Sequence, residues 1–200
     1  MEDKLLARKH FDKAFDHFFA SRNRQAIKEA REAIKYNPKW SRPHWLIGQV
    51  YLCSKPVQLE AAIREFRELT RKEPYWPTGH YTLGRTLARQ NRIEEAMVAL
   101  REALRLDPES ICTRVELAHC LLKRNDYRDA ITVLRGKPSL SPYYTLADAH
   151  LLIAEAWVKW GRKDLARPEW EFVLTLDETI PAYRVAQEEA RRRLRETEKA

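Results

Sequence analysis

The sequence predicts an all-α fold in which pairs of helices follow one another as a repeat. The first observation is a column of alanines spaced 34 or 36 residues apart, at Ala26, Ala62, Ala96, Ala130 and Ala166. The second is another column of small residues with the same spacings, at Ala14, Gly48, Gly84, Ala118 and Ala154. Self-similarity at such a period is typical of a supersecondary unit that stacks on copies of itself.

The third unit shows how each repeat divides into two helices. Between residues 78 and 91 the apolar residues recur at helical spacing, and the pattern breaks at Asn91. A second helix is predicted from Ile93 to Leu106, and Pro108 marks its end because the residue before a proline is disfavoured in the α region. The small residues lie where the two antiparallel helices touch, since a larger side chain would push the axes beyond their usual ~8–10 Å separation.

This pattern resembles the tetratricopeptide repeat family. The resemblance rests on Leu83, Gly84, Leu87, Ala96, Leu100, Ala103 and Pro108 in the third unit, and on Trp45, Gly48, Tyr51, Ala62, Phe66 and Pro74 in the second. It implies a right-handed α-solenoid of about five helix-turn-helix repeats plus a C-terminal capping helix, in one domain over residues 1–200. The expected units are 7–40, 41–76, 77–110, 111–146 and 147–180.

Several units are expected to depart locally from this pattern. The second unit carries two extra residues around Pro56, which we expect in the turn between its helices. In the fourth unit Gly136 shortens the second helix, and Ser141-Pro142 is expected to begin a longer one. Pro168 predicts a late start or a kink in the second helix of the fifth unit.

The last helix is expected over residues 181–198 and should cap the array. Repeat arrays need a terminal element with a polar outer face. One apolar stripe is predicted to pack inward, formed by Ala182, Val185, Ala186, Ala190 and Leu194.

Composition and motifs exclude several classes of protein. No apolar run approaches the ~20 residues that a membrane span needs, and the N-terminus lacks the features of a secretory signal. Three widely spread cysteines favour a reducing compartment, so a cytoplasmic location is predicted. With only 5 glycines and no Gly-x-Ser-x-Gly or His-Glu-x-x-His motif, we expect neither an enzyme nor a cofactor.

Histidines recur in one column, at His10, His44, His80 and His150, with Arg114 in the fourth unit. Equivalent positions in neighbouring units lie ~8–10 Å apart. Zinc ligands lie only ~2.0–2.1 Å from their ion, so this column cannot form a metal site. We expect half-buried, hydrogen-bonded histidines that pack between the two helices of a unit.

The resemblance also implies a concave surface, lined by the first helix of each unit, that receives a peptide or a partner helix. The predicted groove residues are Trp45, Gln49, Tyr81, Thr82, Arg85, Arg89, His119, Lys123, Glu155 and Lys159. Arg85 and Arg89 are four residues apart and should project together. The groove is therefore expected to be aromatic in the first two units and cationic in the last three, which favours a protein or peptide partner with acidic groups.

The sequence thus favours a non-enzymatic protein-interaction module, an adaptor or assembly factor. Nucleic-acid binding is an alternative, because the formal net charge is +8 and arginine beside aromatic rings can stack on bases. Against it, Glu116 and Glu155 interrupt the basic track. A further alternative is a self-associating scaffold, a homo-oligomer held by the aromatic side chains of the first helix: Phe11, Phe15, Phe18 and Phe19.

Overall fold

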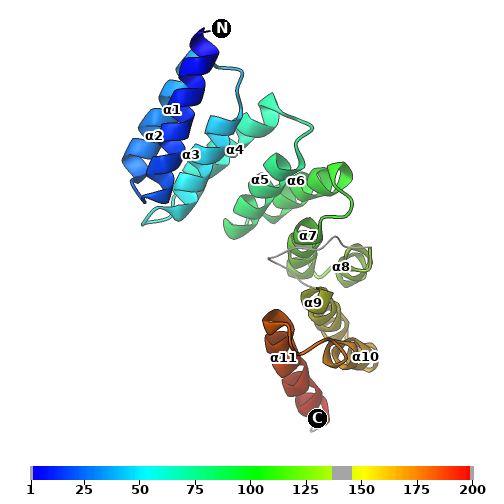
Figure 1. Cartoon of the computed structure of the whole chain (residues 1–200). Helices are drawn as coiled ribbons and strands as arrows, with labels where there is room; N and C mark the ends of the chain where they lie inside the picture. Colours follow the sequence, from blue (N-terminus) through cyan, green and yellow to red (C-terminus); the bar gives the residue numbers. More distant parts are fainter. Residues whose placement is uncertain (1, 137–145, 199–200) are drawn as a thin grey trace. The chain divides into compact units, whose positions relative to one another are not determined.

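The computed structural model describes residues 2–136 and 146–198, in which eleven α-helices and no strand are found (Figure 1). The helices form five consecutive pairs and a final helix, as the sequence predicts. They are α1 (Glu2–Phe19), α2 (Asn23–Tyr36), α3 (Arg42–Cys53), α4 (Leu59–Lys72), α5 (Pro77–Arg89), α6 (Ile93–Leu106), α7 (Ile111–Lys123), α8 (Tyr127–Leu134), α9 (Leu146–Lys159), α10 (Lys163–Leu174) and α11 (Pro181–Glu198).

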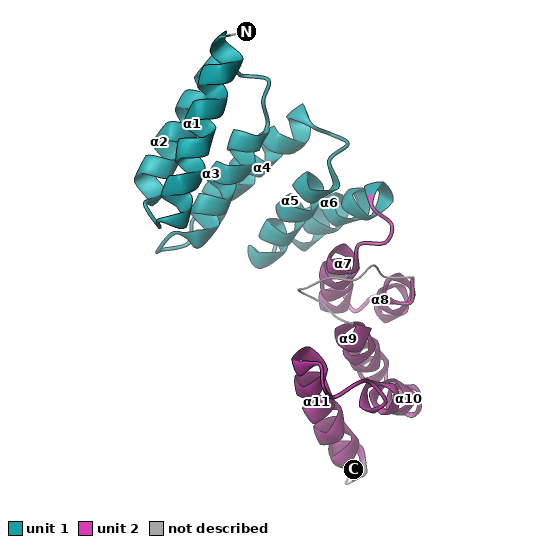
Figure 2. Cartoon of the chain, viewed as in Figure 1, with its two compact units in different colours: residues 1–106 teal, residues 107–200 magenta. Residues whose placement is uncertain are grey.

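Contacts divide the chain into two compact units (Figure 2). Unit 1 comprises residues 1–106 and holds three helix pairs, from α1 to α6. Unit 2 comprises residues 107–200 and holds two pairs and α11. None of the helices in the described ranges combines the length and the apolar character that crossing a membrane requires.

The small residues of the two sequence columns lie at the contacts between paired helices. All five alanines of the first column are fully buried, as are Ala14, Ala118 and Ala154 of the second. A Cβ atom placed on Gly84 would lie 2.6 Å from Cγ of Leu100 and 3.1 Å from the carbonyl oxygen of Ala96. On Gly48 it would clash with the ring of Phe66. These two glycines are therefore required by the close approach of their helices.

The turns inside four of the pairs share one geometry. Each has three residues, and the middle one adopts a left-handed backbone: Ser21, Asn91, Asn125 and Gly161, with φ between 57° and 80°. The backbone N–H of the next residue then bonds back into the helix, as from Arg92 to the carbonyl of Leu87 at 3.0 Å. This is the Schellman arrangement, which satisfies carbonyl groups that a helix end leaves unpaired.

The α3–α4 turn is longer, with five residues from 54 to 58, so the two extra residues lie where the sequence predicts. The Ser54 hydroxyl donates hydrogen bonds to the carbonyl oxygens of Tyr51 at 2.7 Å and Pro56 at 2.8 Å. The longer turn is thus held by its own hydrogen bonds.

In unit 2, α8 ends early, at Leu134, as predicted. The start expected at Ser141-Pro142 lies outside the described residues. Of the late start or kink expected for α10, the late start is wrong, because the helix begins at Lys163 and continues through Pro168. Pro168 is exposed.

α11 packs on α9 and α10 through Ala186 and Ala190, but the predicted stripe is rotated. Val185 is 69 % exposed and Ala182 is also exposed, whereas Gln187 is fully buried. The Gln187 amide donates a 2.8 Å hydrogen bond to the carbonyl of Leu176. A polar side chain therefore lies on the packed face because a backbone carbonyl is available to it there.

Candidate functional site

Three histidines of the column form hydrogen bonds between the two helices of their unit. In each case Nδ1 of the ring lies close to a glutamate carboxylate on the second helix. The distances are 2.7 Å for His10 and Glu29, 2.7 Å for His44 and Glu65, and 2.6 Å for His150 and Glu169. These glutamates are not among the residues predicted from the sequence. The signal was present, because each stands 19 residues after its histidine, or 21 residues in the unit with the longer turn.

The other two positions of the column use backbone carbonyls. Nε2 of His80 lies 2.9 Å from the carbonyl oxygen of Pro74. Arg114 donates from Nη1 to the carbonyl of Val133 at 2.7 Å, and Val133 stands where other units have the glutamate. In the residues that the structure describes, no group of three potential ligands could hold a metal ion. Four of the five column residues thus bond across their own helix pair, whereas His80 bonds to the loop that precedes α5.

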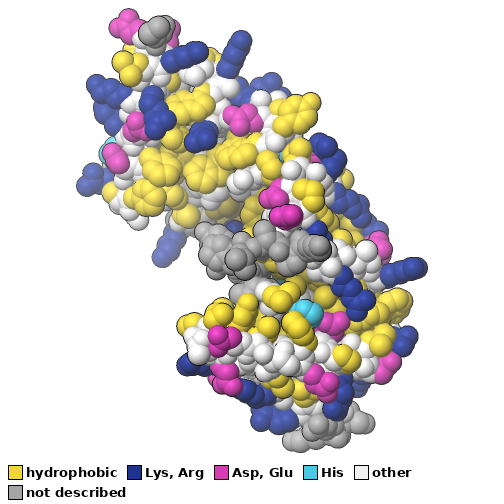
Figure 3. Space-filling view, turned by 45° about the vertical axis from the view of Figure 1, so that its right-hand side comes forward, with side chains coloured by type: hydrophobic (Ala, Val, Ile, Leu, Met, Phe, Trp, Pro, Cys, Tyr) yellow, Lys and Arg dark blue, Asp and Glu magenta, His cyan; other side chains and the backbone are white. Residues whose placement is uncertain are grey.

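A hollow of about 500 Å³ opens in unit 1 between α1, α3 and the beginning of α5. We call it the aromatic groove, because it is lined by the four rings of Phe11, Phe15, Trp45 and Trp76. Five polar residues complete the lining: Arg8, Asp12, Asp16, Arg42 and Thr78. The space-filling view shows hydrophobic side chains gathered over unit 1 with lysine and arginine beside them (Figure 3).

The phenylalanines predicted to drive self-association pack mostly within unit 1. The Phe11 ring is buried, with its centroid 4.7 Å from that of Trp40 and 5.9 Å from that of Phe15. Phe18 packs against the same core cluster and is half-buried. Phe19 is 73 % exposed and is the one member of the four that leaves most of its ring to solvent.

The other groove residues predicted in unit 1 differ in exposure. Gln49 and Tyr81 are half-buried, and Arg85 and Arg89 are exposed on α5. Thr82 does not offer a contact to a partner, which corrects the prediction. It is 8 % exposed, and its hydroxyl donates to carbonyl oxygens of its own helix.

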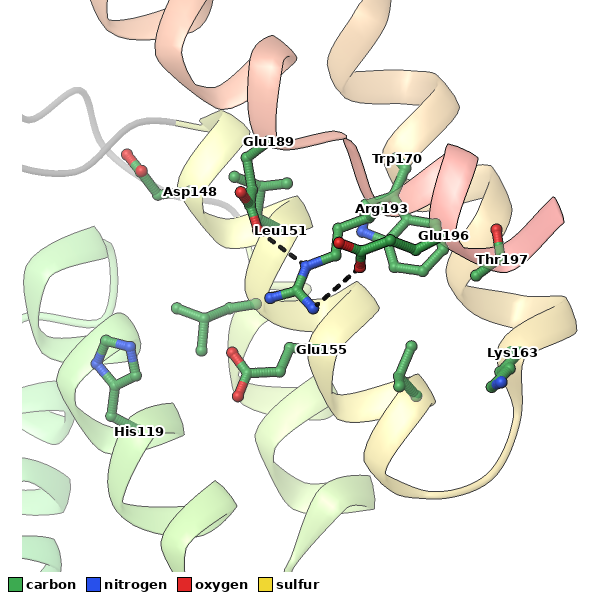
Figure 4. Close-up of a pocket in the computed structure, with 12 residues that line it drawn as sticks. His119, Asp148, Leu151, Glu155, Lys163, Trp170, Glu189, Arg193, Glu196 and Thr197 are labelled. Atoms are coloured by element: carbon green, nitrogen blue, oxygen red, sulfur yellow. Dashed lines mark hydrogen bonds and ion pairs between the residues drawn. The ribbon is translucent and has the colours of Figure 1, made fainter. Parts of the chain in front are cut away.

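Unit 2 contains a second hollow, of about 440 Å³, formed by α7, α9, α10 and α11 (Figure 4). We call it the acidic pocket, because four carboxylates line it, from Asp148, Glu155, Glu189 and Glu196. The cations in its lining are Lys163 and Arg193, and the exposed His119 also faces it. Its apolar lining comes from Leu151, Leu152, Val158 and Trp170.

A cationic surface was expected in this part of the chain, but the pocket is lined by four carboxylates and two cations. Two of its carboxylates, Glu189 and Glu196, stand on α11, which the sequence analysis treated only as a cap. Lys123 is exposed on α7, but Nζ of Lys159 lies 2.9 Å from Oε1 of Glu155 and is held by it.

Arg193 lines the acidic pocket, with its side chain about half exposed. Its Nε is 2.8 Å from Oε1 of Glu189, and its Nη1 is 3.7 Å from Oε2 of Glu196. Burial raises the pKa of Glu189, but hydrogen bonds from Arg192 and Arg193 outweigh burial and hold that pKa below its usual value. Glu189 is thus an ionised carboxylate at neutral pH.

Comparison with known protein families gives two matches in the middle of the chain. Two tetratricopeptide repeat models match, one over residues 58–111 and the other over residues 87–138. A comparison with curated proteins found no match.

Several solved structures share the fold at low sequence identity. MamA from Desulfovibrio magneticus RS-1, from residue 41 to its end, is 14 % identical with a TM-score of 0.74, covering 87 % of this chain and 96 % of that one. YrrB, described as a TPR protein with an unusual peptide-binding site, is 15 % identical with a TM-score of 0.70 and covers 90 % of each chain. A thermophilic TPR protein of Thermus thermophilus is 18 % identical with a TM-score of 0.60, covering 92 % of this chain and 98 % of that one.

Proposed function

Because the chain belongs to the tetratricopeptide repeat family, we propose that it is a non-enzymatic adaptor or assembly factor that holds a partner segment in the aromatic groove. Proteins of this family are generally interaction modules, and YrrB, of the same fold, is described by its peptide-binding site. The observation that carries the proposal is the groove itself, where rings from α1, from α3 and from the residue before α5 line one hollow.

The groove has the features of a binding surface for an apolar anchor. Buried aromatic contacts supply much of the energy of protein interfaces, and polar residues typically form the rim. Here Arg8 and Asp12 make an exposed ion pair at 2.9 Å, and Arg42 is exposed beside the rings. A partner segment with one or two large apolar side chains therefore fits this hollow.

Cations on α5 extend the surface away from the groove. Arg85 and Arg89 follow Thr78 by 7 and 11 residues, which places all three on one side of the helix. At 1.5 Å per residue the two arginines lie about 10 and about 17 Å from Thr78 along the axis. Since an extended chain advances about 3.3 Å per residue, acidic groups three to five residues from the anchor would reach them.

The two predicted lysines of unit 2 differ in whether their charge is available to a partner. Lys123 is exposed and remains a candidate contact for acidic groups. Lys159 is not included, because its charge is already compensated by the Glu155 carboxylate 2.9 Å away.

The test is capture from native extract with full-length protein, followed by identification of the bound proteins. We expect the wild-type chain to retain a partner that the double variant Arg85→Glu, Arg89→Glu and the variant Trp45→Ala both lose. Arg101→Glu, a charge reversal at an exposed site on α6, is the matched control and should retain it. Retention by both groove variants would contradict the proposal.

The captured material also distinguishes this proposal from nucleic-acid binding and from self-association. Binding that nuclease removes, and that weakens log-linearly with salt, would favour a nucleic-acid ligand. A second copy of this chain as the captured partner, lost in Phe19→Ser, would favour a self-associating scaffold.

A further inference from the structure

The acidic pocket of unit 2 combines two features that suit an arginine or lysine side chain. Part of its lining is apolar and buried, since Trp170 is 3 % exposed and Leu152 is 7 % exposed. The rest carries carboxylates from two helices, α9 and α11. Basic side chains bury their hydrocarbon stems against apolar surface while the charged head stays in polar surroundings.

A guanidinium already lines part of this hollow. Figure 4 shows Arg193 extending from α11 toward α9, with the Glu155 carboxylate of α9 turned toward the side where His119 lies. The two carboxylates that hold Arg193 stand on its own helix, at 2.8 and 3.7 Å. The pocket thus accommodates a guanidinium beside its apolar wall.

The Glu155 carboxylate of α9 is held by an exposed partner. Its ion pair with Lys159 joins residues four apart on one helix surface, and both side chains are about half exposed. Exposed pairs of this kind contribute little to stability. An incoming cation with better geometry can therefore replace Lys159 at small cost.

From this geometry we infer that the acidic pocket is a second binding site, which takes a basic side chain of a partner segment. A volume of about 440 Å³ lies near the lower end of the roughly 300–1,000 Å³ found for ligand pockets, so it holds one or two side chains. Arginine is preferred over lysine, because its planar guanidinium donates two parallel hydrogen bonds to one carboxylate. This site selects a charge opposite to the one proposed for the cations of α5.

The test uses the full-length protein and two fluorescein-labelled pentapeptides, each with a central residue flanked by leucines. In one peptide the central residue is arginine, and in the other it is citrulline, which has nearly the same shape but no charge. Fluorescence anisotropy should show the citrulline peptide binding about ten-fold more weakly, the loss expected for one charge-assisted hydrogen bond.

Three variants locate the binding of the arginine peptide. Glu155→Gln should weaken it about ten-fold, and Lys159→Met should strengthen it by freeing the same carboxylate. Glu171→Gln is the matched control, an exposed carboxylate on α10 that does not line the pocket, and it should bind as the wild type does. Glu155 is exposed, so its glutamine variant keeps the fold, which circular dichroism verifies.

Two results would overturn the inference: equal affinity of wild-type protein for both peptides, or equal affinity of the wild type and Glu155→Gln for the arginine peptide. Loss of the arginine peptide in Trp45→Ala would place it in the aromatic groove and would also overturn the inference. Unchanged affinity in Trp45→Ala supports a separate site, so the two proposals fail independently.

Discussion

Nδ1 of His44 lies 2.7 Å from Oε2 of Glu65, so one largely buried hydrogen bond joins α3 to α4. A carboxylate there is acceptor only, and the ring N–H donates to it. Equivalent bonds join α1 to α2 and α9 to α10. Because a half-buried polar group is costly when it lacks a partner, each bond favours one relative position of its two helices.

The bond in the fifth helix pair predicts how stability depends on pH. Burial raises the pKa of Glu169, but hydrogen bonds from His150 and Arg135 outweigh it, so the pKa lies below the ordinary value of 4.5. A lowered pKa in the folded state contributes stability that is fully present above the unfolded-state pKa and is lost as the pH falls through the folded-state pKa.

Urea unfolding at pH 7 and at about pH 3 should therefore show a larger loss of unfolding free energy in the wild type than in Glu169→Gln. Glu171→Gln changes an exposed carboxylate on the same helix and should follow the wild type. If Glu169→Gln and the wild type lose the same free energy of unfolding, the His150–Glu169 bond does not contribute to the pH dependence of stability.

The close contact at Gly84 predicts a large loss of stability on substitution. Gly84→Leu would force side-chain atoms into Leu100 and the backbone of α6, at a cost of about 1–3 kcal/mol or more. Thermal melting followed by circular dichroism should show a clear drop in Tm.

Gly79 offers the control, in the first turn of the same helix. A Cβ atom there would lie 3.5 Å from the side chain of Leu69, an ordinary contact, so Gly79→Ala should hold or raise the Tm. Wild-type melting of Gly84→Leu would show that α5 and α6 do not pack through this glycine.

Ser21 is a position where substitution should stabilise the chain. Its φ of 57° is left-handed, which costs a non-glycine residue about 1–2 kcal/mol, whereas glycine adopts it freely. Ser21→Gly should increase the free energy of unfolding, measured in urea, while Ser21→Ala should not. A decrease with glycine would mean that the turn is not left-handed.

The cysteines should differ sharply in reactivity. Burial raises the pKa of Cys120 to about 11, and its side chain is 1 % exposed, so at pH 8 it is a protonated and inaccessible thiol. Cys53 is exposed. Timed alkylation with iodoacetamide and peptide mass spectrometry should modify Cys53 first and Cys120 only after urea is added. Early modification of Cys120 in the native protein would show that its side chain is not buried on α7.

The repeat spacing predicted the helices well, because small residues at fixed intervals are a direct consequence of close helix pairing. The predicted bounds of α6 and α11 match the structure. The same reasoning misjudged the buried face of α11, since apolar periodicity cannot reveal that a backbone carbonyl would accept a hydrogen bond from Gln187.

The candidate site was harder to predict, because it depends on which elements meet in space. Exposure on one helix face follows from periodicity, and the exposed positions of Arg85 and Arg89 agree with it. The acidic pocket does not follow from it, because Glu189 and Glu196 reach α9 only through the way α11 packs. Thr82 shows the same limit: its hydroxyl bonds to its own helix rather than facing outward.

The three-residue turns have a consequence for how such a chain can change length. Their closing hydrogen bonds begin and end within one helix pair, as from Asp126 to Leu121 and from Arg162 to Trp157. A duplicated or deleted segment of one whole period would carry its turn with it and leave these bonds intact in every remaining pair. Gain or loss of a complete period therefore preserves the turn hydrogen bonds of the remaining pairs, whereas an insertion inside a three-residue turn would break them.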